Sequence, residues 1–368
     1  VAGAPEPTAP ETRHGVVELA AGDLDAPETG ASDLEGIDRL SPPRQAEFRF
    51  MALAVGWSGG DDGAEAPALS LRVSPDGERW SGWLPLATDE DGDAGSIEGS
   101  GWTQLHIVRG GWFQVGVSGE SSTSDASGGV RLVVHYYDAD RGPEASARAM
   151  ADGEPAVISR AGWGADERLR YDASGAEIWP PEYSLPRAEI LHHTVTATDP
   201  ADPAAVVRAI YYYHAVTRGW GDVGYHYLVD HRGNVYEGRF GGERAAGIAV
   251  GAHVLGYNVN TMGIAMLGTF TSASSQPSPA AEAALVELMA RRAIRYGIRP
   301  HGAVSLAGRS YAASVMGHRD VLPGYTVCPG DGLHNRLPAL RDAVAWRLDQ
   351  LQAAATPSPT RTQRPLPT

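Results

Sequence analysis

The 368-residue sequence contains no lysine, only one cysteine and no long apolar run. A single cysteine excludes a framework of intramolecular disulfides, and without a stretch of about 18 apolar residues we expect no membrane-spanning helix. All 30 basic residues are arginine, against 45 acidic residues, and the formal net charge is -15. Because nucleic acids and anionic membranes are bound through clustered basic side chains, this balance argues against both as partners.

Composition divides the chain into several parts. Residues 1–44 combine many Pro, Ala, Glu and Asp residues with little apolar periodicity, which predicts a disordered acidic lead. Residues 45–140 contain apolar runs of period two between turn signals, a pattern that predicts a smaller all-β, sandwich-like domain. Residues 141–155 have the composition of a linker, which predicts separable cores on its two sides. Residues 351–368 are rich in Pro and Thr and predict a disordered tail.

Tryptophans and acidic residues in the predicted β domain each allow two interpretations. Exposed indoles would stack on sugar rings, whereas buried indoles would form the core, and we favour the core. An acidic run could bind Ca²⁺ through its carboxylates. This run lacks a complete calcium-binding loop signature, however, and such runs are more often solvated acidic turns. The residues concerned are Trp57, Trp80, Trp83, Trp102, Trp112 and the segment 89–93.

Residues 156–350 alternate strand-like apolar runs with helical patterns. One predicted helix begins at Pro203 and ends before Gly219. A second has Ser278 as its N-cap and Gly297 as its stop, and a third follows residue 330. Strands that alternate with helices predict an α/β domain in which a mixed sheet has helices on both sides.

Two histidine-bearing segments bracket about 130 residues of this domain. A strand-like run ends in His192 and His193; the second segment carries His318 and, ten residues later, Cys328. Adjacent residues of a strand face opposite ways, so only one of the paired histidines can face a given ion. That histidine, His318 and a Cys328 thiolate would supply three ligands to a tetrahedral Zn²⁺ and leave the fourth position to water, as in hydrolytic sites. The competing interpretation is packing histidines and a small buried cysteine.

Further motifs lie around and between these segments, in the order ISRAGWG at 158–164, ILHHT at 190–194, GWGDVGYHYLVD at 219–230, GAHVLGYN at 251–258 and TMGIAMLG at 261–268. In this order they closely resemble the zinc amidase family that includes peptidoglycan recognition proteins, phage amidase-type lysozymes and bacterial N-acetylmuramoyl-L-alanine amidases. The likeness covers about residues 157–341, roughly half of the chain.

The resemblance implies a role for five residues. It identifies His192, the first histidine of the pair, as a zinc ligand together with His318 and Cys328. Tyr225 matches a family tyrosine whose hydroxyl contacts the attacking water and the developing oxyanion. Thr326 matches a position that lysine or threonine holds in active members.

Nearby residues carry weaker expectations. We expect His193, His214 and His226 to pack within the fold rather than to bind metal. The interval from the second histidine ligand to the cysteine is two residues longer than is usual in the family, with Gly324 and Tyr325 as the apparent insertion.

The resemblance also implies the function. We expect an amidohydrolase with one Zn²⁺ that hydrolyses the amide between the lactyl group of N-acetylmuramic acid and L-alanine in peptidoglycan or its soluble muropeptides. The alternative is a peptidoglycan-binding recognition protein without catalysis. The sequence begins without a signal-peptide pattern, so the chain is either a mature form or one that was never exported. The substrate favours a secreted or cell-wall-associated protein, whereas a recycling enzyme would work inside the cell. We expect a monomer. The absence of lysine beside abundant Ala, Gly and Pro favours a bacterial source of high GC content.

Overall fold

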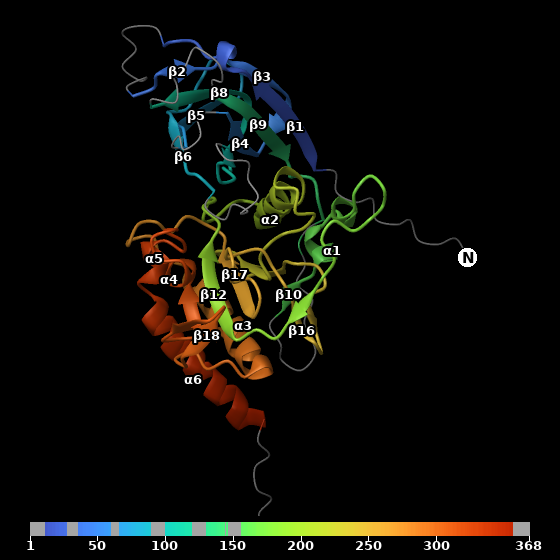
Figure 1. The fold of residues 1–368 in the computed structure, drawn as a ribbon, viewed down its shortest axis with the longest axis vertical. Coiled ribbons are helices and arrows are strands. Elements are labelled where there is room, and N and C mark those ends of the chain that lie inside the picture. The colour runs from blue at the N-terminus through green and yellow to red at the C-terminus, as the bar shows by residue number, and fades with distance from the viewer. Residues whose placement is uncertain are drawn as a thin grey trace, which may run out of the picture.

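The computed structural model describes residues 12–27, 36–59, 66–89, 100–119, 130–143, 145 and 156–355. Figure 1 shows a β sandwich, coloured blue to teal, that sits above an α/β domain, coloured green to red. Residues 90–93, most of the predicted linker, and the tail from residue 356 lie outside the described residues. Within the described part of the chain, no helix combines the length and apolar character needed to cross a membrane.

Two antiparallel sheets form the sandwich. The first has the order β1-β9-β4-β7, with bounds Arg13–Leu19, Arg131–Asp138, Ala52–Ser58 and Gly101–Trp102. The second has the order β2-β8-β5-β6, and β3 also pairs with β8; the bounds are Arg39–Leu40, Gly110–Ser118, Ala68–Ser74, Leu84–Leu86 and Arg44–Phe50. A short 3₁₀ helix, η1, spans Ala21–Asp23. Alternating apolar residues from both sheets fill the space between them.

The sandwich begins earlier in the chain than predicted. Strand β1 pairs with β9 over its whole length, from Arg13 opposite Asp138 to Leu19 opposite Leu132. The prediction of a disordered lead over residues 1–44 is therefore wrong for its described strands, β1, β2 and the start of β3. The local composition is polar, but pairing with β9 satisfies the backbone of β1 and lets Leu19 enter the core.

The tryptophans divide between the core and half-buried positions. Trp57 is 8% exposed and belongs to the sandwich core, as predicted. The other four are half-buried, and the rings of Trp80 and Trp83 lie 5.1 Å and 4.8 Å from the Arg72 guanidinium carbon. Cation–π packing accounts for these two positions without a sugar.

The α/β domain is built on a six-stranded mixed sheet, and the predicted fold class is confirmed. Its order is β10-β14-β13-β17-β12-β20, with bounds Val157–Ile158, Val235–Glu237, Tyr227–Val229, Thr261–Met266, Ala188–His193 and Val315–Gly317. Only β13 and β14 pair antiparallel; the other neighbours are parallel. Small peripheral strands are β11 (Tyr183–Ser184), β15 (Glu243–Arg244), β16 (Gly247–Ala249), β18 (Val304–Leu306) and β19 (Arg309–Tyr311).

Helices cover the two faces of this sheet. The long ones are α2 (Pro203–Tyr212), which a π-helical segment continues over Tyr213–Thr217, α3 (Pro279–Tyr296) and α6 (Leu337–Ala355). The short ones are α1 (Arg160–Trp163), η5 (Glu167–Arg170), α4 (His318–Val321) and α5 (Asp331–His334). The predicted caps of the second helix are present, because Ser278 accepts from Ala281 N–H and Gly297 has a φ of 68°. Helix α6 ends at Ala355, slightly beyond the predicted boundary at residue 350.

One hydrophobic cluster joins the sandwich to the α/β domain. From the sandwich side it contains Met51, Ala52, Ala54, Leu105, Tyr137 and Ala139, which pack with α2. In addition, the buried Arg208 of α2 donates from Nε to the Ala139 carbonyl at 2.9 Å. The sandwich and the α/β domain each also have a cluster of their own, so the predicted cores are present but this third cluster is shared between them. The composition of a linker describes only the segment that connects two domains. The surface through which the domains contact each other is formed mostly by residues far from the linker in sequence.

Candidate metal centre

The histidine pair lies at the end of strand β12, beside the end of β20. Their parallel register sets Leu191 opposite Gly317, so the next residues, His192 and His318, lie side by side. Both side chains are fully buried, with ring centroids 4.7 Å apart. His193 instead accepts a hydrogen bond at Nδ1 from the backbone of Phe270 at 3.2 Å.

Cys328 reaches the histidines from the loop after α4. The N–H of Arg319 donates to the Cys328 carbonyl at 2.8 Å and closes this loop at its base. Gly324 and Tyr325 are both exposed between these ends, so the apparent insertion lies at the outer turn of the loop. The structure thus brings Cys328 to the histidines despite the longer interval, with its Sγ 3.6 Å from His192 Nδ1.

The predicted ligands His192, His318 and Cys328 form a compact, buried donor set whose ligand atoms all lie within 4.8 Å of one another. Ligands held tetrahedrally at about 2.0–2.3 Å from zinc are about 3.5 Å apart, which the Sγ–Nδ1 distance of 3.6 Å matches. Burial lowers the pKa of His318 to about 4, so its imidazole is neutral near pH 7, the form that binds metal. Two imidazoles and one thiol at this spacing fit zinc.

A hydrogen-bonded chain behind His192 determines which of its nitrogens faces the donor set. His192 Nε2 lies 3.0 Å from His253 Nδ1, and His253 Nε2 lies 3.3 Å from Thr261 Oγ1. The Thr261 hydroxyl donates to the Tyr257 carbonyl at 2.6 Å, so towards His253 it acts as an acceptor. His253 therefore holds its proton on Nε2 and accepts the Nε2 proton of His192, which leaves the lone pair of His192 Nδ1 directed towards Cys328. His253 was not among the predicted site residues, although it lies within the motif GAHVLGYN at 251–258.

Tyr225 approaches the donor set from the segment before β13. Its ring centroid lies 5.3 Å from that of His192, and its side chain is buried. A Cβ at Gly224 would lie 2.1 Å from the Ala252 carbonyl oxygen, so glycine is required for this segment to pack so closely. The structure places the Tyr225 side chain next to His192 and on the wall of the cavity beside Cys328.

The remaining predicted residues lie around the same place. Thr326 is half-buried and accepts at Oγ1 from the Cys328 N–H at 3.0 Å, which holds the backbone of the cysteine. His226 accepts from Gly263 N–H at 2.8 Å and hydrogen-bonds the Ala249 carbonyl at 2.7 Å, in agreement with a packing role. His214 packs 5.6 Å from the Tyr225 ring, and burial lowers its pKa to about 3.

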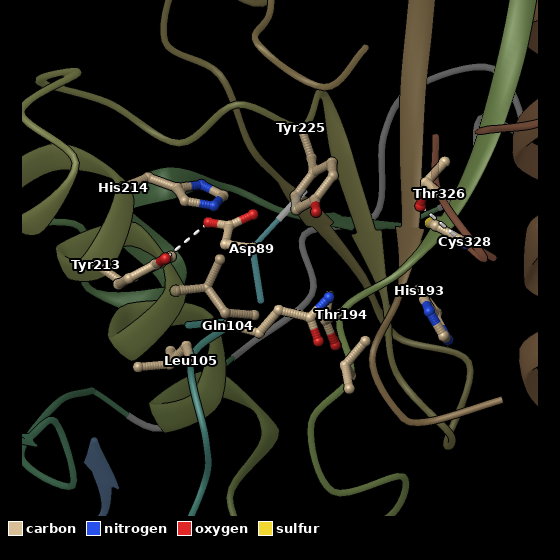
Figure 2. Close-up of a pocket in the computed structure, with 12 residues that line it drawn as sticks. Asp89, Gln104, Leu105, His193, Thr194, Tyr213, His214, Tyr225, Thr326 and Cys328 are labelled. Atoms are coloured by element: carbon tan, nitrogen blue, oxygen red, sulfur yellow. Dashed lines mark hydrogen bonds between the residues drawn. The ribbon is translucent and has the colours of Figure 1, made fainter. Parts of the chain in front are cut away.

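Both domains line a cavity of about 50 Å³ beside Cys328. Figure 2 shows Tyr225, Thr326 and Cys328 on its α/β side. The sandwich contributes Asp89, Gln104 and Leu105. No sequence signal placed these three residues beside the predicted zinc ligands, because only the docking of the two domains brings them there.

Asp89 anchors the sandwich side of the cavity. Its Oδ2 accepts from the Tyr213 hydroxyl at 2.7 Å and forms an ion pair with Arg218. The side chains of Asp89 and Arg218 are only 10% and 6% exposed. Both interpretations of the acidic run, a Ca²⁺ site and a solvated turn, are therefore wrong for Asp89, since its carboxylate is buried against arginine.

Sequence comparison relates the α/β domain to an amidase family. A sequence model of the N-acetylmuramoyl-L-alanine amidase family, Amidase_2, matches residues 182–331. A human protein named N-acetylmuramoyl-L-alanine amidase is 35% identical over 176 residues, which cover 46% of this chain and 27% of the human protein. Peptidoglycan-recognition protein SC2 of Drosophila melanogaster is 30% identical over 152 residues, which cover 40% of this chain and 70% of that protein. The chain thus spans only about a quarter of the human relative.

Solved structures show a similar likeness. Peptidoglycan recognition protein-LE, solved in complex with tracheal cytotoxin, a monomeric diaminopimelic acid-type peptidoglycan, is 26% identical. The match covers 50% of this chain and 92% of that one, with a TM-score of 0.38.

Proposed function

This chain belongs to the N-acetylmuramoyl-L-alanine amidase family, which includes peptidoglycan recognition proteins, and on that premise we propose that it is a zinc-dependent amidase acting on peptidoglycan. The bond cleaved is the amide between the lactyl group of N-acetylmuramic acid and the L-alanine of the stem peptide. The observation that carries the proposal is the buried donor set of His192, His318 and Cys328. A recognition protein needs the groove but not three ligands at zinc spacing.

The residues around the donor set have separable tasks in hydrolysis. Zinc bound by the donor set would supply Lewis acidity and lower the pKa of a coordinated water towards about 7. The Tyr225 hydroxyl would donate to the oxyanion that forms as water attacks the amide carbon. Thr326 would offer a second polar contact near the departing amine. Water adds across the C–N bond, leaving a lactyl carboxylate and the free amine of L-alanine.

The substrate also suggests where the protein works. Peptidoglycan lies outside the cytoplasmic membrane, so we propose that the protein acts there, secreted or associated with the cell wall. The two domains share a buried core within one chain, and we propose a monomer.

Zinc analysis combined with mass spectrometry of digested muropeptides tests the proposal. We expect stoichiometric zinc and products with a free lactyl carboxylate and a free L-alanine amine. Cys328→Ser should lose both zinc and turnover, because a serine hydroxyl stays protonated near neutral pH and does not replace a thiolate. His318→Ala should behave in the same way.

A matched control is His301→Ala. The His301 side chain is 54% exposed and pairs with Asp342 at the surface, so its loss should change neither zinc content nor turnover. A wild-type protein that binds muropeptides but leaves the amide intact would replace the amidase with the recognition protein. Full turnover in Cys328→Ser would refute the ligand set.

A further inference from the structure

Gln104 of the sandwich projects a side-chain amide into the cavity beside the donor set. Figure 2 shows this amide directed towards Thr194 from the sandwich side. Its Oε1 is buried and, among the described residues, no hydrogen-bond donor contacts it. A buried acceptor without a donor destabilises a protein unless a ligand supplies the donor.

The backbone around Gln104 is held in place on three sides. The Gln104 N–H donates to the Ala87 carbonyl at 2.8 Å. The preceding carbonyl, that of Thr103, accepts from the Tyr213 hydroxyl at 2.8 Å. The following residue, Leu105, is 4% exposed within the cluster shared by the two domains. The amide is thus presented from a fixed backbone, as a binding group requires.

The sandwich forms a permanent wall rather than a movable cover. Domains move relative to each other when their interface is small or polar. Here the interface contains a shared hydrophobic core, the buried ion pair of Asp89 with Arg218, and a hydrogen bond between the hydroxyls of Tyr137 and Thr217. Opening it would expose all three at once.

The size of the cavity limits what reaches Gln104. About 50 Å³ accommodates only a few heavy atoms, far less than the roughly 300–1,000 Å³ that encloses a whole small ligand. Only a small group next to the reacting bond can enter, and a muropeptide carries amide groups on both sides of that bond. The side-chain amide of Gln104 both accepts and donates, so it matches such a group in either orientation.

We propose that the sandwich is part of the substrate site and that Gln104 is a specificity-determining residue, which pairs with an amide group of the substrate beside the scissile bond. The proposal rests on the proposed amidase function for its choice of substrate. It assigns to the sandwich a direct contact with the muropeptide at the reacting end.

Steady-state kinetics of the full chain on a soluble disaccharide-peptide muropeptide tests this contact. Gln104→Leu keeps the approximate volume and removes the amide, and Gln104→Ala removes the side chain. One lost neutral hydrogen bond should raise KM about 2–10-fold, with kcat, zinc content and Tm close to wild type. Gln45→Ala, an exposed glutamine of β3 in the same sandwich, is the matched control and should leave KM unchanged.

The possible outcomes distinguish a failure of the proposed Gln104 contact from a failure of the proposed amidase function. An unchanged KM in both Gln104 variants would refute the proposed contact between Gln104 and the substrate. A rise in kcat/KM would also refute it and would show that the sandwich obstructs the site. Equal losses for Gln104→Leu and Gln45→Ala would also refute it. If the wild-type protein binds the muropeptide without cleaving it, the amidase proposal fails alone, and the same comparison on Kd still decides the role of Gln104.

Discussion

The buried ion pair between Asp89 and Arg218 predicts strong energetic coupling between the two domains. Replacing Asp89 by alanine leaves a guanidinium that is 6% exposed without its carboxylate. Breaking a buried pair in this way costs about 3–5 kcal/mol. The Trp220 ring, 4.9 Å from the guanidinium carbon, contacts it in the wild type and in the variant, so this cation–π contact does not change the difference. We therefore expect Asp89→Ala to lower the free energy of unfolding by about 3–5 kcal/mol.

A double-mutant cycle in urea measures this coupling. The four proteins are wild type, Asp89→Ala, Arg218→Met and the double variant. Because the Arg218→Met substitution removes the buried charge that Asp89 neutralises, the double variant should lose much less than the sum of the single variants, with an interaction energy above about 1.5 kcal/mol. The control cycle uses Arg109 and Asp140, whose side chains are 59% and 43% exposed, and should give about 0–1 kcal/mol. Additive losses at Asp89 and Arg218 would refute the reasoning.

Two further predictions concern histidines. His192→Ala should abolish zinc binding, whereas His193→Ala should keep zinc and lose about 1–3 kcal/mol of stability, because the Phe270 N–H loses its acceptor. Metal analysis and urea unfolding measure the two effects. Zinc loss in His193→Ala alone would identify His193, rather than His192, as the ligand. Burial lowers the pKa of His106 from 6.5 to about 4 in the folded protein. As the pH falls, the unfolded state therefore binds a proton before the folded state does. The contribution of neutral His106 to the free energy of unfolding is complete above pH 6.5 and is lost between pH 6.5 and 4. From pH 7.5 to 4.5, His106→Leu should lose about 2–3 kcal/mol less than wild type; parallel pH dependences would show that His106 does not contribute.

Local sequence patterns were sufficient for the boundaries of the long helices α2 and α3. Pro203, Ser278 and Gly297 act through their own backbone or caps, so they mark helix boundaries without knowledge of the rest of the fold. The strand containing Arg13–Leu19 escaped prediction because its stability depends on β9, more than a hundred residues away. A short strand in polar surroundings carries too little local signal to compete with its composition.

By itself the sequence determined the fold class of the α/β domain, because strand-like and helical patterns alternate along it. It also determined which residues come together as a candidate zinc site, because their types suit zinc and the order of the motifs resembles that of zinc amidases. Only the tertiary structure decided the tautomer chain through His253 and Thr261, which depends on hydrogen-bond directions. Only the tertiary structure, too, placed Asp89 and Gln104 against the cavity. Those contacts form where the surfaces of two domains, distant in sequence, pack against each other. Neither segment alone contains both partners of such a contact.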